Sequence, residues 1–132
     1  MAKKTTPKAD PTASTDPYGT FAMVYETMLL HPSFQKLSPG AKNYYLLCRA
    51  QATSKKGRAC LYKHGDAEGK TYSENCFVFP SAHQKRFGVH RGNGRRYMNN
   101  LIEAGFVECI EMNQYRHKPN VFRFSTKWKD TS

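Results

Sequence analysis

The sequence predicts an α+β fold that is mainly helical, and three observations lead to this expectation. Apolar residues recur at helical spacing in the first half of the chain and again over residues 91–104. Apolar and polar residues alternate over 106–112 and 121–128, as they do in half-buried strands. The chain has 132 residues, of which 39% are hydrophobic, and this suits one domain with a modest core.

The chain begins with a segment whose composition differs from the rest. Residues 1–18 are rich in Thr, Pro, Ser and Asp, which predicts a disordered basic tail. The lysines Lys3, Lys4 and Lys8 could add nonspecific affinity for a polyanion or serve only solubility, and both interpretations stay open. We expect a folded domain over residues 19–129 and a short tail over 130–132.

A first helix is expected in the stretch FAMVYETMLL, where Pro32 should end it. Its apolar residues follow the i, i+3, i+4, i+7, i+8 pattern of a helix with one buried face, and they are Phe21, Val24, Tyr25, Met28 and Leu29. A core face is favoured for this stripe over a partner-binding face.

A second helix is expected from Pro39 to about Thr53. Ser38 is a good N-cap, and proline suits the first helical position. The residues at buried spacing are Ala41, Tyr44, Tyr45, Leu47 and Cys48.

Residues 54–76 are polar, charged and rich in glycine, and they read as an ordered excursion or a mobile insertion. A hairpin is one option, with CLYKH and KTYSE as arms around GDAEG.

A short strand is expected at 77–79 and a short helix after Pro80. Ser81 is the expected N-cap of that helix, with Ala82 and Phe87 facing inward. Gly88 can then turn the chain, because glycine adopts positive φ.

The next expected elements are a helix in RGNGRRYMNNLIEA, a strand in FVECIEM, a loop in NQYRHKPN and a strand in VFRFSTKW. In the last strand Val121 and Arg123 should lie on one side, with Phe122, Phe124 and Trp128 on the other. A helix–turn–helix followed by a β-hairpin is the winged-helix arrangement. We therefore predict a winged helix-turn-helix with an extra N-terminal helix and a C-terminal β-hairpin wing.

The stretch FGVHRGNGRRYMNNLIEAGFV resembles the helix-turn-helix of GntR-type regulators. The positions that keep the family pattern are Gly88, Val89, Arg91, Gly92, Arg95, Leu101, Gly105 and Val107, with Met98 and Phe106 in place of leucines. His90 replaces the usual Ser or Thr at the cap, and Gly94 replaces a buried valine. Either the helix begins late, or a bulky neighbour such as Tyr97 fills the gap. No effector domain is expected, because the chain ends soon after Trp128.

A weaker resemblance covers more of the chain. The stretch FAMVYETMLLHPSFQKLSPGAKNYYLL, followed later by FVFP, is similar to the N-terminal winged-helix region of replication initiators of Gram-positive plasmids and mobile elements. The matching residues are Leu37, Ser38, Ala41, Lys42 and Tyr45. This likeness implies a plasmid, phage or mobile-element protein.

Charge is strongly positive and unevenly placed. The formal net charge is +11, with 21 Lys+Arg against 10 Asp+Glu, which points to a polyanionic partner. Residues 75–102 and 113–129 contain no acid but many cations, and they coincide with the expected helix-turn-helix and wing. Duplex DNA is therefore the expected partner.

The expected DNA-contacting residues come from three elements. On the last helix, burying Met98 and Leu101 turns the arginines outward, where arginine can read guanine and asparagine can read adenine. Its glycines, Gly92 and Gly94, would let the helix N-terminus approach a phosphate. The candidates are Ser81, His83, Gln84 and Lys85 on the preceding helix, His90, Arg91, Asn93, Arg95, Arg96 and Asn99 on the last helix, and Arg116, His117 and Lys118 at the wing tip.

Other classes of site are not expected. Cys48, Cys60, Cys76 and Cys109 form no CxxC pair, so we expect reduced thiols and no metal site. No catalytic motif stands out, and neither an enzyme nor a cofactor is expected. Neither a membrane span nor a secretory signal is predicted, which favours a cytoplasmic, nucleoid-associated protein.

The predicted function is sequence-specific binding of double-stranded DNA, as a small transcriptional regulator or a replication or transfer accessory factor. RNA binding is the main alternative, because eight Tyr and eight Phe could stack on bases. A winged-helix protein-interaction module is a further alternative. A homodimer stays open.

Overall fold

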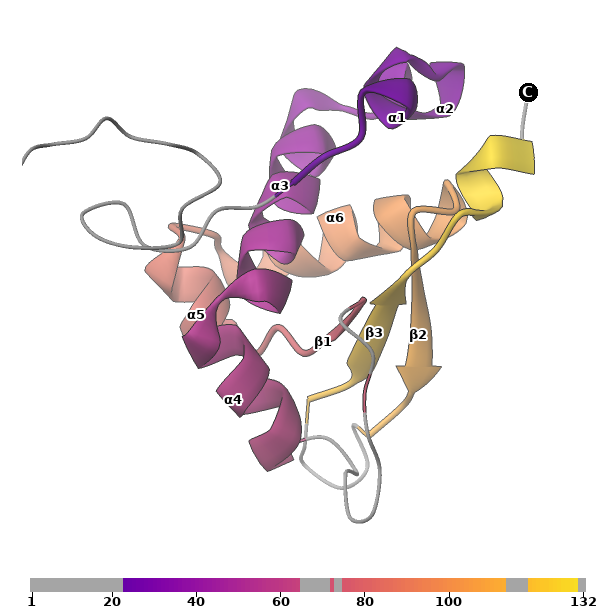
Figure 1. The fold of residues 1–132 in the computed structure, drawn as a ribbon. Coiled ribbons are helices and arrows are strands. Elements are labelled where there is room, and N and C mark those ends of the chain that lie inside the picture. The colour runs from indigo at the N-terminus through magenta and orange to yellow at the C-terminus, as the bar shows by residue number, and fades with distance from the viewer. Residues whose placement is uncertain (1–22, 65–71, 73–74, 114–118, 131–132) are drawn as a thin grey trace, which may run out of the picture.

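The computed structural model describes residues 23–64, 72, 75–113 and 119–130 (Figure 1). In chain order the elements are α1 (Glu26–Leu30), α2 (Pro32–Gln35), α3 (Pro39–Thr53), α4 (Lys55–His64), β1 (Cys76–Phe77), α5 (Ser81–Arg86), α6 (Arg91–Glu103), β2 (Val107–Glu111), β3 (Val121–Phe124) and the 3₁₀ helix η2 (Lys127–Asp130). The predicted α+β class is confirmed. The predicted tail at 1–18 lies outside the described residues. None of the described helices combines the length and apolar composition needed to cross a bilayer.

The three strands form an antiparallel sheet in the order β1-β3-β2. In the β2–β3 hairpin Val107 lies opposite Phe124, and the register shifts between Cys109 and Glu111. On the other side of β3, Phe77 of β1 lies opposite Phe122. The small sheet therefore has β3 at its centre.

Two strand predictions need correction in their bounds. The strand expected at 77–79 is Cys76–Phe77, and Val78 and Phe79 are buried beyond its end. The strand expected over 121–128 ends at Phe124, where the chain leaves the sheet and forms η2. Trp128 is nevertheless buried, because η2 packs its ring on Phe106 at a centroid distance of 5.7 Å.

The sheet packs on both faces. Phe77, Phe122 and Phe124 lie on one face, with Phe77 and Phe124 stacked at 4.8 Å, and they join the main core against α3 and α6. Val121 points to the opposite face, since neighbouring residues of a strand alternate, and packs with Leu61 of α4. Figure 1 shows α4 continuing past the end of α3 beside β1.

The prediction for α3 is confirmed at both ends. Ser38 Oγ accepts a hydrogen bond from the Ala41 N–H at 3.2 Å, and the helix runs to Thr53. Of the residues expected inside, Ala41, Tyr44, Tyr45 and Cys48 are buried, while Leu47 is half-buried.

The N-terminal helix expected from the apolar stripe is present and ends before Pro32 as predicted, but it is shorter than expected, and Phe21 lies outside the described residues. α1 begins only at Glu26, and after His31 a separate short helix starts with Pro32 at its first position. Met28 is buried, but Tyr25 is 63% exposed and Leu29 41% exposed. A helix of little more than one turn cannot place a stripe that spans two turns on one face.

The hairpin interpretation of residues 54–76 is also wrong for its first arm. Residues 55–64 form α4, which Ser54 caps by accepting the Gly57 N–H at 2.9 Å. Cys60 and Leu61 face the core from this helix. The cap and this burial outweigh the low helix propensity of the polar, glycine-containing sequence. Of the second arm only Tyr72 is described, and it is buried, with its hydroxyl donating to Glu111 Oε2 at 2.9 Å.

The turn before α6 agrees in part with its prediction. Gly88 has φ of 78°, as expected for the residue that ends a helix and reverses the chain. The N-cap of α5 is Pro80, however, and Ser81 is the first helical residue. Ala82 is exposed, whereas Phe87 packs partly buried against the main core.

Candidate nucleic-acid interface

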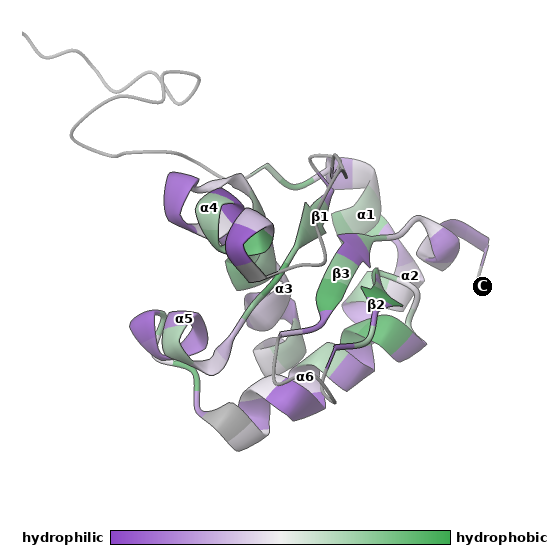
Figure 2. Cartoon of the chain, turned by 90° about the horizontal axis from the view of Figure 1, so that it is seen from below, coloured by the Kyte–Doolittle hydropathy of each residue, from purple (hydrophilic) through white to green (hydrophobic). Residues whose placement is uncertain are grey.

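Helix α6 has one buried side and one open side. Met98 and Leu101 are buried against α3, as the sequence predicted. The residues described as exposed are Gly92, Asn93, Arg95, Arg96, Asn99 and, at the C-terminal end of the helix, Glu103. Figure 2 shows hydrophilic and hydrophobic positions alternating along α6. The run GNGRR is thus the first part of a helix and not a loop.

The N-terminus of α6 has an N-cap residue, His90, whose side chain does not cap the helix. His90 is extended at φ −73° and ψ 141°, and its exposed side chain makes no capping hydrogen bond. The first N–H groups of a helix have no partner within the helix, and they carry its partial positive charge. The substitution of histidine for the usual Ser or Thr therefore leaves this end open to an outside acceptor.

The two arginines of α6 differ in their contacts. Arg96 Nη2 donates to Asn93 Oδ1 at 3.1 Å and to the Tyr97 hydroxyl at 3.5 Å. Its guanidinium lies 5.1 Å from the Tyr97 ring centroid. Arg95 instead stands with Asn99, four residues later, at the edge of a cavity. Within the described part of the chain, neither arginine forms an ion pair with a carboxylate.

Gln84 of α5 fills the gap left by Gly94. A Cβ at Gly94 would overlap Gln84 Oε1 and come within 3.4 Å of Val89 Cγ1. Gln84 Nε2 donates to the Phe79 carbonyl at 2.7 Å, which holds the side chain in place, while its Oε1 is buried without a hydrogen-bond partner. Of the two alternatives, the late start is wrong because α6 begins at Arg91, and the neighbour that fills the gap is Gln84 and not Tyr97.

Tyr97 packs elsewhere, and the two glycines of α6 have different surroundings. The Tyr97 ring covers Gly40 and lies 5.9 Å from Tyr44. Gly94 is buried against Gln84, so the close approach it allows is to the protein itself. A Cβ at Gly92 would meet nothing within 4 Å, so only this glycine faces open space.

His83 also turns inward from α5. Its Nδ1 lies 2.9 Å from Nε2 of Gln51, a fully buried residue of α3 whose Nε2 also donates to the Val78 carbonyl at 2.9 Å. His83 and Gln84 therefore fix α5 to the rest of the fold. Ser81 and Lys85 are the candidate residues of α5 with exposed side chains.

Sequence reasoning missed Gln51, although a signal was present. Tyr44, Cys48 and Gln51 follow i, i+4, i+7 along the buried side of α3. A polar residue at such a position needs a buried hydrogen-bond partner, and this predicts a contact with another element.

A cavity of about 580 Å³ lies between α5, α6 and the β2–β3 hairpin. Ser81, Arg95 and Asn99 are among its polar lining residues. Its apolar lining residues include Met98, Ile102, Cys109, Met112 and Phe122. Of the predicted reading residues of α6, Arg95 and Asn99 therefore border the space between this helix and the hairpin.

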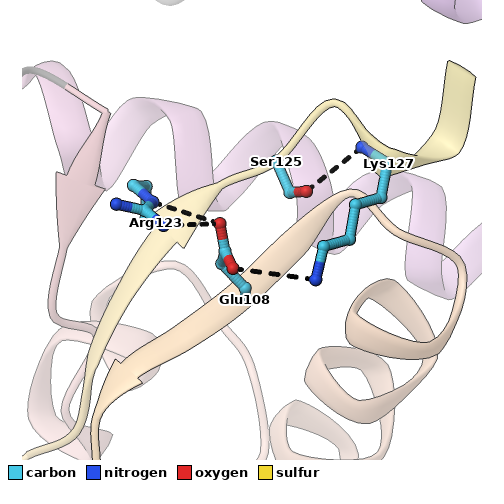
Figure 3. Close-up of polar contacts among 4 residues, drawn as sticks. All are labelled: Glu108, Arg123, Ser125 and Lys127. Atoms are coloured by element: carbon cyan, nitrogen blue, oxygen red, sulfur yellow. Dashed lines mark hydrogen bonds and ion pairs between the residues drawn. The ribbon is translucent and has the colours of Figure 1, made fainter.

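The hairpin compensates part of its own charge. Glu108 Oε2 accepts from Arg123 Nε at 3.1 Å and Nη2 at 2.9 Å, and Lys127 Nζ lies 3.9 Å from Glu108 Oε1 (Figure 3). Residues 113–129 contain no acid in sequence, but Glu108 of the neighbouring strand lies beside their cations in the structure. The predicted wing-tip residues Arg116, His117 and Lys118 lie outside the described residues, and the side chain of Arg91 is not described.

The cysteines are consistent with simple thiols. All four are free, and Cys48, Cys60 and Cys76 are buried. Burial raises the pKa of the Cys48 and Cys109 thiols above the usual value, which favours their protonated form. Among the described residues no group of three His, Cys, Asp or Glu side chains could hold a metal ion.

Comparison of the chain with protein-family models, with curated proteins and with solved structures found no match.

Proposed function

We propose that this protein binds double-stranded DNA as a winged-helix module, with α6 as the helix that enters the major groove. The observation that carries the proposal is the open side of α6, where Arg95, Arg96, Asn93 and Asn99 are exposed opposite the buried Met98 and Leu101. No Asp or Glu occurs between residues 75 and 102, so α5 and the first three turns of α6 present no acid to a polyanion, and the one acid of α6 is Glu103 at its last position.

The arrangement around α6 supports the same proposal. α5 precedes α6 through a short turn at Gly88, and the β2–β3 hairpin follows it directly. This is the element order of a helix-turn-helix with a wing, in which the second helix reads base edges. Arg95 and Asn99 lie one helical turn apart on the same side, at the spacing of neighbouring base pairs read by one helix.

The aromatic residues favour duplex DNA over single-stranded RNA. Single-stranded RNA is recognised largely by bases that stack on exposed aromatic rings. Most of the described rings serve the core here, and Phe34, Tyr44, Tyr45, Phe77, Phe79, Phe106, Phe124 and Trp128 are all buried. The residues around α6 offer guanidinium and amide groups instead.

The roles of α5 and the hairpin follow from the exposed residues. Ser81 and Lys85 of α5 would contact the phosphate backbone and fix the orientation of α6. His83 and Gln84 would act indirectly, by holding α5 in place. The likeness to plasmid replication initiators makes a regulator or a replication or transfer accessory factor of a mobile element the proposed context.

The proposal is tested by selecting duplexes from a random pool and measuring their affinity by fluorescence anisotropy at several salt concentrations. The natural chain should prefer selected over random duplex and lose affinity steeply as salt rises. Arg95→Ala should weaken selected duplex by about 1–3 kcal/mol, or about 5- to 150-fold, and reduce the preference over random duplex. The matched control is Lys63→Ala, which removes an exposed cation at the far end of α4.

Two results would count against duplex recognition by α6. One is equal affinity for selected and random duplex in the natural chain. The other is an equal loss for Arg95→Ala and Lys63→Ala. Tighter binding of a single-stranded RNA pool than of any selected duplex would favour the RNA alternative.

A further inference from the structure

A second cavity, of about 260 Å³, lies between α1, α3 and the C-terminal end of β3. It shares no lining residue with the cavity beside α6 and contains no residue of that helix. Among the described residues that line it, the cations are Arg49 and Lys129, and none is Asp or Glu. Its aromatic walls are formed by Tyr25, Tyr45, Phe124 and Trp128.

The guanidinium of Arg49 is held in place by two rings. Its Cζ lies 3.8 Å from the Phe124 ring centroid and 5.4 Å from that of Tyr45. Arg49 Nε donates to the Tyr45 hydroxyl at 2.9 Å. This hydrogen bond uses Nε alone. The two Nη groups can therefore donate a bidentate pair of hydrogen bonds to a carboxylate or a phosphate.

Arg49 carries a positive charge that its protein surroundings do not neutralise. It is half-buried, and among the described residues no carboxylate forms an ion pair with it. The faces of aromatic rings attract a cation, but they do not replace the hydrogen bonds that water or an anion gives to a guanidinium. The site is thus organised for an anion before one arrives, and such preorganisation lowers the cost of binding.

The shape of the cavity limits the body of the ligand. Pockets for drug-sized ligands measure about 300–1,000 Å³. A volume of about 260 Å³ lies just below this range and suits one ring with a charged head group. Ser125, Thr126 and the exposed Lys129 add polar groups around the same cavity. Phe77 and Arg49 already cover the Phe124 ring, and Trp128 stacks on Phe106, so the exposed Tyr25 is the ring with a face open to a planar apolar body.

We propose that this cavity binds a small aromatic carboxylate, with the carboxylate on the Nη groups of Arg49 and the ring against Tyr25 and Trp128. The proposal does not depend on DNA binding, because the two regions share no lining residue. It predicts a small-molecule site in a chain for which no effector domain was expected.

Sodium benzoate is the probe, titrated into the full chain. Trp128 is the chain's one tryptophan, so its indole N–H resonance and its fluorescence both report on this cavity. Benzoate should shift the resonance saturably. Benzamide, which keeps the ring without the charge, and acetate, which keeps the charge without the ring, should each bind about tenfold more weakly or worse.

Arg49→Met should reduce benzoate affinity by about tenfold or more, since it keeps an unbranched apolar stem but removes the guanidinium and its donors. Arg95→Met is the matched control on α6 and should leave benzoate binding unchanged. If Arg49→Met fails to fold, as judged by near-UV circular dichroism, Arg49→Lys is used to test the role of Arg49 instead. Lysine keeps the charge but lacks the planar fork, and benzoate should then bind about fivefold more weakly.

Four results would overturn the proposal. They are the absence of a Trp128 shift at about 10 mM benzoate, equal binding of benzamide or acetate, equal losses for Arg49→Met and Arg95→Met, and unchanged binding in Arg49→Lys.

Discussion

Helices α5 and α6 are neighbours with similar polar composition, yet they use their polar side chains in opposite directions. On α5, His83 meets the buried Gln51 of α3, and Gln84 donates to a backbone carbonyl. On α6, Arg95 and Asn99 are exposed at the edge of a cavity. His83 and Gln84 of α5 thus hold the fold together, while Arg95 and Asn99 of α6 face outward.

The comparison implies that stability and binding are separable within this unit. Substitutions on the inward side should change the free energy of unfolding and leave the DNA affinity of the folded chain almost unchanged. Substitutions on the outward side should do the reverse, because exposed side chains without partners contribute little to stability.

The largest effect is expected from Gln51→Ala. It removes an amide that lies 2.9 Å from both the Val78 carbonyl and His83 Nδ1, and it leaves a cavity in the core. The free energy of unfolding should fall by about 2–4 kcal/mol, measured by urea denaturation. Gln35→Ala, in an exposed position of α2, should cost about 0.5 kcal/mol or less. Equal costs would mean that Gln51 does not anchor α5.

The second-largest effect on stability should differ in sign between the two glycines of α6. Gly94→Ala should destabilise by about 1 kcal/mol, because the new methyl group would displace Gln84 from its hydrogen bond to the Phe79 carbonyl, and the better helix propensity of alanine offsets part of that cost. Gly92→Ala should instead stabilise by up to about 1 kcal/mol, since its position is open and alanine is the better helix former.

A double-mutant cycle sharpens the assignment to Gln84. In the Gln84→Ala background the cost of Gly94→Ala should largely disappear, because the overlapping side chain is gone. If Gly94→Ala costs the same in both backgrounds, a different neighbour fills the gap.

The third effect tests the outward side. Asn99→Ala should weaken binding to selected duplex DNA by about 1 kcal/mol, or about fivefold, with unfolding free energy unchanged within about 0.5 kcal/mol. Asn43→Ala makes the same chemical change at an exposed position of α3 and should not alter DNA binding. Equal DNA affinities of the two variants would remove Asn99 from the proposed reading residues.

Local rules predicted the elements whose signals lie within their own sequence. The cap at Ser38, the end of α3 at Thr53, the positive φ of Gly88 and the buried Met98 and Leu101 all follow from capping, turn chemistry and helical period. Each depends on residues within a few positions of one another.

The misses share a dependence on tertiary contacts. α4 looked like a hairpin because its helix is stabilised by Leu61 packing against the sheet, which a propensity argument does not include. His83 and Gln84 looked like surface residues because their partners, Gln51 and the Phe79 carbonyl, lie on other segments. Likewise, the acid-free run at 113–129 gave no sign that Glu108 pairs with Arg123 across the hairpin.

The smallest effect concerns that ion pair, and it extends the comparison to the hairpin. Glu108 lies 2.9 Å from Arg123 and 3.9 Å from Lys127, and the side chains of Arg123 and Lys127 are 47% and 74% exposed. Because such exposed pairs contribute about 0–1 kcal/mol, Glu108→Gln should lower the free energy of unfolding by about 0.5 kcal/mol. The variant keeps the shape of the side chain while releasing both cations from their counter-charge.

The DNA affinity of Glu108→Gln then shows whether this part of the hairpin lies near the phosphate backbone. If it does, affinity at low salt should rise slightly, and the slope of log affinity against log salt should steepen by up to about 0.9 for each cation that gains a phosphate. An unchanged slope would place Arg123 and Lys127 away from the DNA, with α6 and the exposed residues of α5 making the contacts. The charged residues of the hairpin would then resemble His83 and Gln84 of α5, because they would stabilise the fold and not contact DNA.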